Sequence, residues 1–185
     1  MLTKFYLHGG GSSEDTPVNL EYRKNILAKI AHNPKILLCY FASEPEMVQE
    51  RYKIDSENLW AINPNIHFDI ATEENFEEEC KNNELIFLAG GDTFRLLDKL
   101  KQYPNFSELI KGKIVVGTSA GAYALSKYFY SNDENRIGEG LGILNIKIHC
   151  HYSNEKFGNV EKLKEFKEDI EIVTLKEQEY VVVFV

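Results

Sequence analysis

The chain has 185 residues, of which 43% are hydrophobic and 27% charged, a balance typical of one globular domain spanning residues 1–185. Its net charge of −8 repels phosphate backbones, which argues against nucleic acid as a partner. No apolar run approaches the roughly 20 residues that cross a bilayer, and the N-terminus has no apolar signal-peptide core, so no membrane partner is expected either.

The cysteines indicate the expected compartment. Cys39, Cys80 and Cys150 are odd in number and widely spaced, so they match neither a disulfide framework nor the paired ligands of a zinc site. We therefore expect reduced thiols in a cytoplasmic protein, with no metal and no cofactor.

Short apolar runs alternate along the chain with amphipathic stretches of helical spacing. In chain order the sequence predicts a strand at 5–7, a helix at 20–31, a strand at 36–41, a helix at 45–59, a strand at 66–70, a helix at 73–82, a strand at 85–88, a helix at 92–101, a strand at 114–116 and a helix at 122–130. Apolar strands separated by helices predict an α/β fold. It would be a three-layer sandwich with a mostly parallel central sheet and helices on both faces.

The C-terminal part follows a different pattern. Residues 146–152 are expected to form a strand and residues 157–167 a helix. Two further strands, at 170–175 and 180–184, are joined by a short turn. A short turn makes the two strands antiparallel, so we expect a C-terminal hairpin added to the sheet.

Three glycine clusters each follow a predicted strand. They are Gly9–Gly11, Gly90–Gly91 and Gly117–Gly121. Ligands of parallel sheets bind beyond the carboxyl ends of the strands, so the three clusters indicate one shared site.

The third cluster contains a candidate nucleophile. Gly117-Thr118-Ser119-Ala120-Gly121 fits the G-x-S-x-G pattern between a predicted strand and a predicted helix, as a nucleophile elbow requires. The small neighbours of Ser119 tolerate a tight turn, and the N–H groups at the start of the next helix favour an oxyanion. The alternative is an ordinary glycine-rich turn between strand and helix.

A serine nucleophile needs a base, and the base needs an orienting acid. His149 and His151 share one face of a predicted strand, and either could turn toward Ser119. The candidate acids are Asp133, Glu134, Glu177 and Glu179. Of these, Glu177 lies in a turn between two predicted strands, close to where a sheet-end site would be.

Four segments, in matching order and spacing from about Leu85 onward, carry a family resemblance. They are Ala89–Thr93 followed by Leu96-Leu97, Gly117–Ala122, Gly140–Leu144 followed by His151-Tyr152, and Leu175–Glu177. Together they resemble the family of aspartyl dipeptidase (dipeptidase E) and cyanophycinase. These are serine peptidases whose fold is like that of class I glutamine amidotransferases.

This resemblance implies roles for particular residues. Ser119 would be the nucleophile, His151 the base and Glu177 the acid, with Asp133 or Glu134 as the alternative acid. The oxyanion hole would consist of the backbone N–H groups of Gly91 and Ala120. The candidate substrate-binding residues are Gly90, Asp92, Thr93, Arg136 and His149. The implied substrate is a small peptide, with N-terminal Asp dipeptides as a candidate class, and a homodimer is a candidate assembly.

One departure from the family concerns specificity. The family's dipeptidase recognises aspartate with an arginine after its histidine, whereas residues 153–167 here contain lysines at 156, 162, 164 and 167 but no arginine. Arg95 and Arg136 are the candidates to supply the cation from elsewhere.

Three other functions compete with a peptidase. An α/β-hydrolase esterase would use His8-Gly9-Gly10-Gly11 as its oxyanion loop, but its acid and histidine follow the serine in a different chain order. We expect this loop to line the same sheet-end cleft instead. A glutamine amidotransferase needs a cysteine where Ser119 stands. A binding or sensor module remains the alternative if His151 does not reach Ser119.

Overall fold

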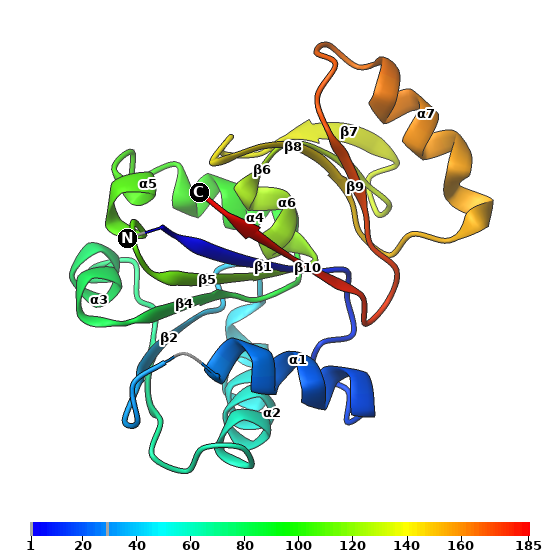
Figure 1. Cartoon of the computed structure of the whole chain (residues 1–185). Coiled ribbons are helices and arrows are strands. Elements are labelled where there is room, and N and C mark those ends of the chain that lie inside the picture. Colours follow the sequence, from blue (N-terminus) through cyan, green and yellow to red (C-terminus); the bar gives the residue numbers. More distant parts are fainter. Residues whose placement is uncertain (1, 29) are drawn as a thin grey trace.

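A six-stranded sheet forms the larger part of the computed structural model, which describes residues 2–28 and 30–185 (Figure 1). The strand order is β10-β1-β5-β4-β2-β3, and all neighbours from β1 to β3 pair in parallel. The strands are β1 (Lys4–His8), β2 (Lys35–Cys39), β3 (His67–Ile70), β4 (Leu85–Leu88), β5 (Ile114–Thr118) and β10 (Tyr180–Phe184).

Successive residues of these strands point into two hydrophobic clusters, one on each face of the sheet. Leu37 and Val115 belong to one cluster, whereas Ile36 and Val116 belong to the other. The first face is covered by α3 (Phe76–Asn82), α4 (Thr93–Leu100), α5 (Phe106–Leu109) and α6 (Ala120–Leu125). The second is covered by α1 (Pro17–Leu27) and α2 (Val48–Trp60), which η1 (Pro45–Met47) precedes. Burial of both faces explains the continuous apolar runs and confirms the predicted α/β fold class.

The helix expected at residues 20–31 is α1, which begins at Pro17. It begins there because the Thr16 side chain caps it, accepting a hydrogen bond from the Asn19 N–H at 3.3 Å. Residue 29 of the expected range lies outside the described residues, as does residue 1. Within residues 2–28 and 30–185, no helix is both long and apolar enough to cross a membrane.

A second, four-stranded sheet lies at one end of the larger sheet (Figure 1). Its order is β7-β6-β8-β9, with β6, β8 and β9 parallel and β7 antiparallel to β6. The strands are β6 (Ser126–Ser131), β7 (Arg136–Glu139), β8 (Leu144–His149) and β9 (Ile172–Thr174). One face packs on α7 (Phe157–Glu165), which η2 (Asn154–Lys156) precedes, and the other face joins the core of the larger sheet.

The prediction of a helix through residue 130 is wrong, because β6 begins at Ser126. The buried Ser126 hydroxyl donates to the Tyr123 carbonyl at 2.8 Å and closes the last turn of α6. Tyr128 then faces α7, whereas Phe129 faces the core of the larger sheet. This two-residue alternation is provided by a strand and not by a helix.

The C-terminal strand β10 is antiparallel, as expected, but its partner is β1 rather than the strand that precedes it. Lys4 pairs with Phe184 in the larger sheet, whereas β9 pairs in parallel with β8 in the smaller one. Residues 175–179 therefore cross between the two sheets and do not close a hairpin. The crossing allows Val181 and Val183 to pack against the core of the larger sheet.

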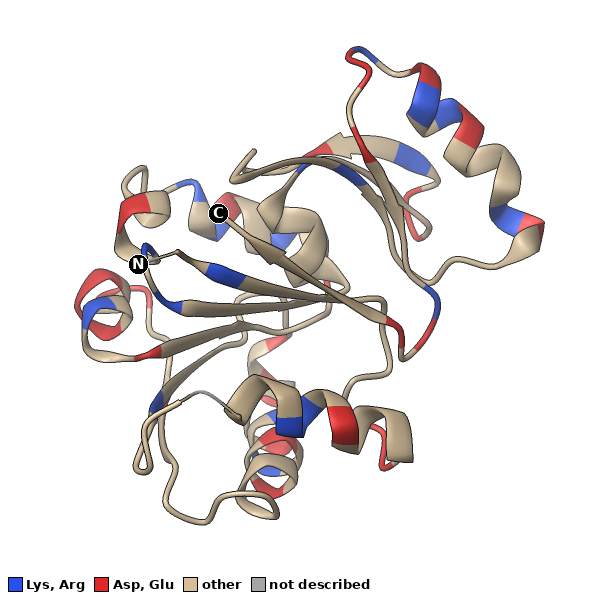
Figure 2. Ribbon diagram, in the orientation of Figure 1, with Lys and Arg blue, Asp and Glu red and all other residues tan. Residues whose placement is uncertain are grey.

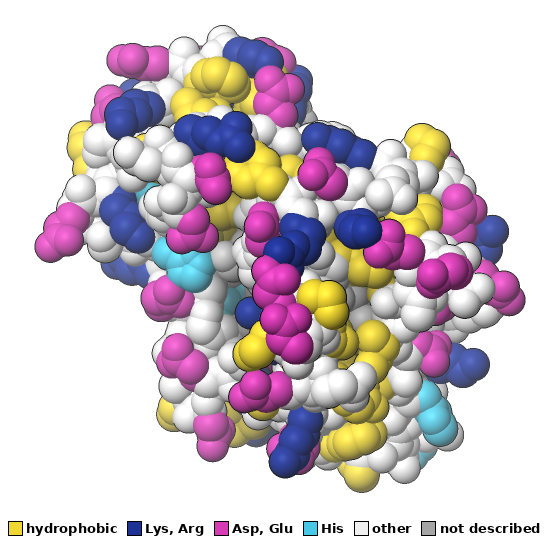
Figure 3. All heavy atoms as spheres, turned by 180° about the vertical axis from the view of Figure 1, so that it is seen from behind, with side chains coloured by type: hydrophobic (Ala, Val, Ile, Leu, Met, Phe, Trp, Pro, Cys, Tyr) yellow, Lys and Arg dark blue, Asp and Glu magenta, His cyan; other side chains and the backbone are white. Residues whose placement is uncertain are grey.

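Charged residues of both signs occur on the helices, the connections and the strand ends (Figure 2). On the face opposite to that of Figure 1, acidic and basic side chains are interspersed (Figure 3). Ion pairs at the surface include Arg95 with Glu44, and Lys99 with Glu73 at 2.7 Å. The negative net charge is therefore not gathered into one patch on this face.

Candidate active site

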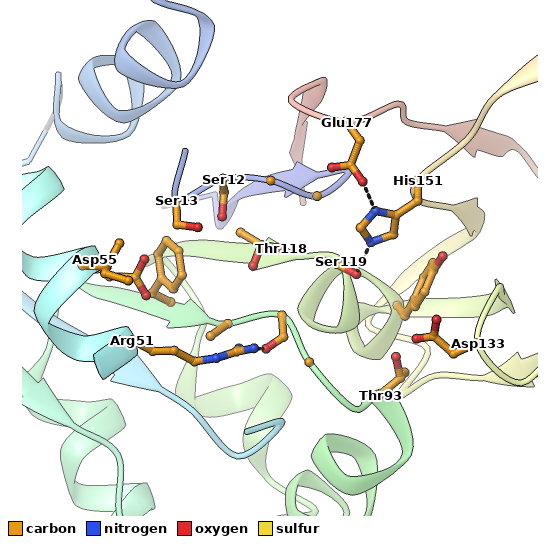
Figure 4. A pocket seen from close by; sticks show the side chains of 18 of the residues that line it. Ser12, Ser13, Arg51, Asp55, Thr93, Thr118, Ser119, Asp133, His151 and Glu177 are labelled. Atoms are coloured by element: carbon orange, nitrogen blue, oxygen red, sulfur yellow. Dashed lines mark hydrogen bonds and ion pairs between the residues drawn. The ribbon is translucent and has the colours of Figure 1, made fainter. Parts of the chain in front are cut away.

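A cleft of about 800 Å³ lies beyond the carboxyl ends of β1, β4 and β5. The three glycine clusters found in the sequence all contribute to its wall, through Gly10–Gly11, Gly90–Gly91 and Thr118–Ser119. Residues of α2 line one side of the cleft. Residues that follow strands β6 and β8 of the smaller sheet line the opposite side (Figure 4). The cleft therefore lies between the two sheets and α2.

Ser119 occupies a strained turn between β5 and α6. Its φ of 48° and ψ of −103° lie outside the regions that L-residues ordinarily adopt. Glycine is required on both sides of the turn. A Cβ built on Gly117 would lie 2.7 Å from the carbonyl carbon of Gly121, and one built on Gly121 would lie 2.9 Å from the Leu88 Cβ. The turn is thus held tight enough to present the Ser119 hydroxyl to the cleft.

His151 reaches Ser119 from the smaller sheet. It follows β8, and its Nε2 lies 2.7 Å from the Ser119 Oγ (Figure 4). Its other ring nitrogen, Nδ1, contacts the Glu177 carboxylate, which lies in the segment that crosses between β9 and β10. Because a carboxylate accepts from Nδ1–H, the neutral ring has Nε2 free to accept the serine proton.

Two backbone N–H groups are candidates for an oxyanion hole, since Gly91 lines the same cleft as Ser119 and Ala120 follows Ser119 directly. Gly91 has a φ of 138°, and Ala120 is the first residue of α6. In the described part of the chain, the Gly91 N–H has no hydrogen-bond acceptor, and the Ala120 N–H has none beyond its own helix. Donors of this kind can stabilise negative charge that develops on a bound carbonyl oxygen.

The other candidate acids do not contact His151 in the described part of the chain. The Glu134 carboxylate pairs with Arg136 at 3.8 Å, and the Glu179 carboxylate accepts the Lys176 N–H at 3.0 Å. Asp133 lines the cleft, on the side of Thr93 (Figure 4). Glu177 is therefore the acid that the geometry brings to the imidazole.

The candidate substrate-binding residues divide into two groups. Gly90 and Thr93 line the cleft. Asp92 instead caps α4, accepting from the N–H groups of Phe94 and Arg95 at 2.9 and 3.0 Å. The structure does not bring Asp92 to the cleft because the cap directs its carboxylate at the helix.

The expected cations also lie elsewhere. The Arg136 guanidinium stacks 4.1 Å from the centre of the Phe94 ring, and Arg95 pairs with Glu44. Neither of these two arginines lines the cleft. Among residues 2–28 and 30–185, the cations that line it are Arg51 and Lys156, and Arg51 does not appear among the residues that the sequence pattern singled out.

Arg51 and Asp55 form the far end of the cleft, on α2 (Figure 4). Arg51 donates to the Gly90 carbonyl at 2.5 Å, and Asp55 accepts from the Tyr40 hydroxyl at 2.9 Å. Burial raises the pKa of Asp55 above its ordinary value. The signal that could have revealed the pair is their four-residue spacing, which puts both on one face of a helix.

His149 lies behind the cleft and not in its wall. Its side chain is fully buried, and its Nε2 lies 2.9 Å from the Asn132 Oδ1. Burial, with smaller effects from Lys156 and His151, lowers the pKa of His149 to about 4. The strand histidine that contacts Ser119 is thus His151.

Comparison with known protein families gives one match over nearly the whole chain. The model of peptidase family S51 matches residues 5–184. An uncharacterized peptidase of Listeria innocua is 32% identical over 110 residues, which cover 51% of this chain and 53% of the relative. One of Listeria monocytogenes is 30% identical over 107 residues, which cover 50% and 52%. The chain thus spans about half the length of the curated relatives it matches.

Solved structures agree in fold. A peptidase from an acI-B1 Actinobacterium superposes with a TM-score of 0.73 at 21% identity, covering 99% of this chain and 84% of the other. A protein of Listeria monocytogenes EGD-e, provisionally called Peptidase E, superposes with a TM-score of 0.69 at 16% identity, covering 100% and 95%. At these identities the likeness concerns the fold alone.

Proposed function

The chain belongs to peptidase family S51, and from this premise we propose that it is a serine peptidase that hydrolyses small peptides. One observation carries the proposal: the Ser119 Oγ lies 2.7 Å from the Nε2 of His151, whose Nδ1 contacts Glu177. In the proposed roles Ser119 is the nucleophile, His151 the general base and Glu177 the orienting acid.

The reaction proceeds in two halves. The Ser119 oxygen attacks the peptide carbonyl while His151 takes the hydroxyl proton, and the negative charge on the former carbonyl oxygen is stabilised by the N–H groups of Gly91 and Ala120. The C–N bond then breaks as the imidazolium returns that proton to the leaving amine. A water molecule, deprotonated by the same ring, then attacks the acyl-enzyme. As the bond between the acyl carbon and the Ser119 oxygen breaks, the imidazolium returns the proton to that oxygen, which releases the acid product and free Ser119.

The direction of the substrate follows from these roles. The leaving nitrogen must lie near the His151 Nε2, so the acyl residue lies on the other side of Ser119, toward Arg51 and Asp55 (Figure 4). There the guanidinium can pair with an acidic side chain of the acyl residue, and Asp55 or Glu50 can accept from a free amino terminus. This supports dipeptides with an N-terminal aspartate as the preferred substrates, with Arg51 as the cation. A cleft of about 800 Å³ suits a ligand of that size.

The competing functions find less support. The glycine loop after β1 lies against the His151 ring and the Glu177 carboxylate, on the base and acid side of Ser119. This is not the place of an esterase oxyanion loop, which must donate to the carbonyl oxygen. A binding module would not need Ser119 and His151 at hydrogen-bond distance.

Labelling with a fluorophosphonate probe, read by intact mass, tests the proposal. We expect wild type to gain the mass of one probe, and the Ser119→Ala and His151→Ala variants to gain none. Unlabelled wild type is assayed separately on Asp-Xaa, Ala-Xaa and Lys-Xaa dipeptides, with Asp-Xaa expected to be cleaved fastest. A folded wild type that neither labels nor cleaves any of these peptides would contradict the peptidase and favour the binding module.

A further inference from the structure

Two buried histidines have no role in the reaction above, and each is paired with an asparagine. His8 Nε2 lies 3.1 Å from the Asn19 Oδ1, and His149 Nε2 lies 2.9 Å from the Asn132 Oδ1. Neither histidine is exposed to solvent, and burial is the largest effect that lowers the pKa of each to about 4. Both rings are therefore neutral at neutral pH.

The first pair holds the glycine loop that follows β1. The Gly10 N–H donates to His8 Nδ1 at 3.2 Å, so the ring proton is on Nε2, from which it donates to Asn19. The Asn19 amide in turn donates to the carbonyls of Gly11, at 2.7 Å, and Glu14, at 3.0 Å. His8 and Asn19 thus fix the loop by three bonds to its backbone.

This loop supports the base and the acid. Gly10 has a φ of 136°, and its Cα packs so closely that a built Cβ would overlap the His151 ring and lie 2.7 Å from the Glu177 carboxylate. The backbone makes direct bonds as well: the Gly9 carbonyl accepts the His151 N–H at 3.0 Å, and the Gly10 carbonyl accepts the Gln178 N–H at 2.9 Å. A shift of the loop would therefore move both the base, His151, and its orienting acid, Glu177.

The second pair holds His151 from the smaller sheet. The Asn132 amide donates to the carbonyl of Cys150 at 3.0 Å, directly before His151. His151 itself has a φ of 52°, a strained conformation that persists only where the surroundings fix it. The Tyr123 hydroxyl contributes to this by bonding both the N–H and the carbonyl of Cys150, at 3.1 and 3.2 Å.

We propose that these two histidine–asparagine pairs are positioning residues, which hold the His151 ring from opposite sides so that it bridges Ser119 and Glu177. This inference rests on the proposed function, because it assigns the pairs to the same proton transfer. Neither pair contacts the reacting atoms: the first acts through Gly10, which packs against the His151 ring, and the second through Cys150, which directly precedes His151. The His8 ring must be neutral, since an imidazolium has no free acceptor for the Gly10 N–H.

The first pair is tested by two substitutions of His8, whose ring bonds to Asn19 and to the Gly10 N–H. His8→Phe fills the space and loses both bonds, whereas His8→Asn keeps an acceptor near the Gly10 N–H. We expect His8→Phe to lower kcat about 10- to 100-fold with KM changed less than about twofold, because a misplaced base slows chemistry without weakening binding. His8→Asn should recover most of kcat.

The matched control is Tyr22→Phe. The Tyr22 ring is buried 4.5 Å from the His8 ring, centre to centre, and its hydroxyl has no hydrogen-bond partner in the described part of the chain. Its removal should leave kcat unchanged. The second pair is tested by His149→Phe, with His149→Gln as the rescue, since glutamine can still donate to Asn132.

Two readouts distinguish positioning from mere stability. Rates are expressed per folded molecule, measured by near-UV circular dichroism, so unfolded protein does not count, and NMR follows the proton on His151 Nδ1. We expect its resonance to shift or vanish in His8→Phe and return in His8→Asn. An unchanged kcat per folded molecule, with an unchanged resonance, would overturn the inference. If wild type neither labels nor cleaves the dipeptides, the proposed function fails, and the resonance still tests whether the pairs hold the ring.

Discussion

The serine and the histidine of the candidate site come from different sheets, and they are placed by different kinds of interaction. Ser119 ends a strand in the middle of the larger sheet, and its turn is fixed by glycines two residues away on either side. His151 follows β8 of the smaller sheet and is held by hydrogen bonds with Gly9 and Lys156. The hydrogen bonds from Asn132 and Tyr123 to the preceding Cys150 hold it as well. A local motif can therefore present a nucleophile, whereas its activation depends on how two sheets pack together.

The largest effect on this dependence between the two sheets is expected from removal of Glu177, the acid in the segment that connects them. We expect Glu177→Gln to lower kcat by about 10³- to 10⁴-fold, because the imidazolium loses its counter-charge and its ring orientation. Unfolding by urea should be nearly unchanged, since the Glu177 side chain is 56% exposed. Glu179→Gln, in the same turn, is the control and should keep normal kcat. A Glu177→Gln enzyme with near-normal kcat would remove Glu177 from its role.

A smaller effect is expected when only the contact between the two sheets is disturbed. The methyl group of Gly10→Ala would overlap the His151 ring, so we expect kcat to fall about 100-fold. Gly158→Ala is the control: no atom lies within 4 Å of a Cβ built there, and the helix should gain about 0.5–1 kcal/mol of stability. Steady-state kinetics and urea unfolding measure both. Equal kinetics for the two variants would show that the loop does not support the base.

Preference for an acidic substrate should depend on the larger sheet and its helices alone, since Arg51 lies on α2, which covers that sheet. Loss of a charge-assisted hydrogen bond predicts that Arg51→Met lowers kcat/KM for Asp-Xaa about tenfold relative to Ala-Xaa. Arg95→Met, which removes a surface partner of Glu44, should leave this ratio unchanged. A constant ratio in the Arg51 variant would place the acidic recognition elsewhere, with Lys156 as the next cation of the cleft to test.

The free energy of unfolding is expected to change at acidic pH. Each sheet contains one buried histidine, His8 in β1 and His149 in β8. The pKa values of His8 and His149 are about 4 in the folded protein against an ordinary 6.5, so the unfolded chain binds protons first as the pH falls. Stability should decline between about pH 6.5 and pH 4 and level off below, by roughly 3 kcal/mol per histidine.

Urea midpoints measured across this range give the slope. The variant His8→Asn with His149→Gln should show a shallower decline. Comparison with wild type cancels contributions from carboxylates such as Asp55, whose raised pKa acts with the opposite sign. Equal slopes would mean that the histidines are not buried in their neutral form.

Much of the larger sheet could be predicted from the sequence, because its strands are buried on both faces and appear as continuous apolar runs. The smaller sheet could be predicted only in part: strands were expected where β8 and β9 lie, but not where β6 and β7 lie. Residues 126–131 continue directly from α6, and their alternation becomes visible only once α7 is known to pack on one side. The partner of β10 was also missed, because a short connection suggests a hairpin unless two sheets are known to lie beside it.

The same division applies to the site. The elbow at Ser119 follows from the residues alone, since only tiny neighbours fit its turn. Residue patterns left His149 and His151 equally placed, and the left-handed backbone at His151, which turns its ring into the cleft, depends on distant contacts. Arg51 was missed because an arginine on an amphipathic helix is ordinarily a surface residue, and its partner is a carbonyl of a remote loop.

The pairing of Lys4 with Phe184 has a consequence for the order of folding. It joins β1 to a strand at the far end of the sequence, so its loop-closure entropy is large and such contacts form slowly. Glu177 lies in the segment between β9 and β10, whose two ends are fixed only when β10 has paired with β1. A chain that has collapsed but has not yet closed this pair would hold its serine without the acid. Recovery of turnover after dilution from urea would then lag behind recovery of helix signal, and enzymatic activity would report the final step of folding.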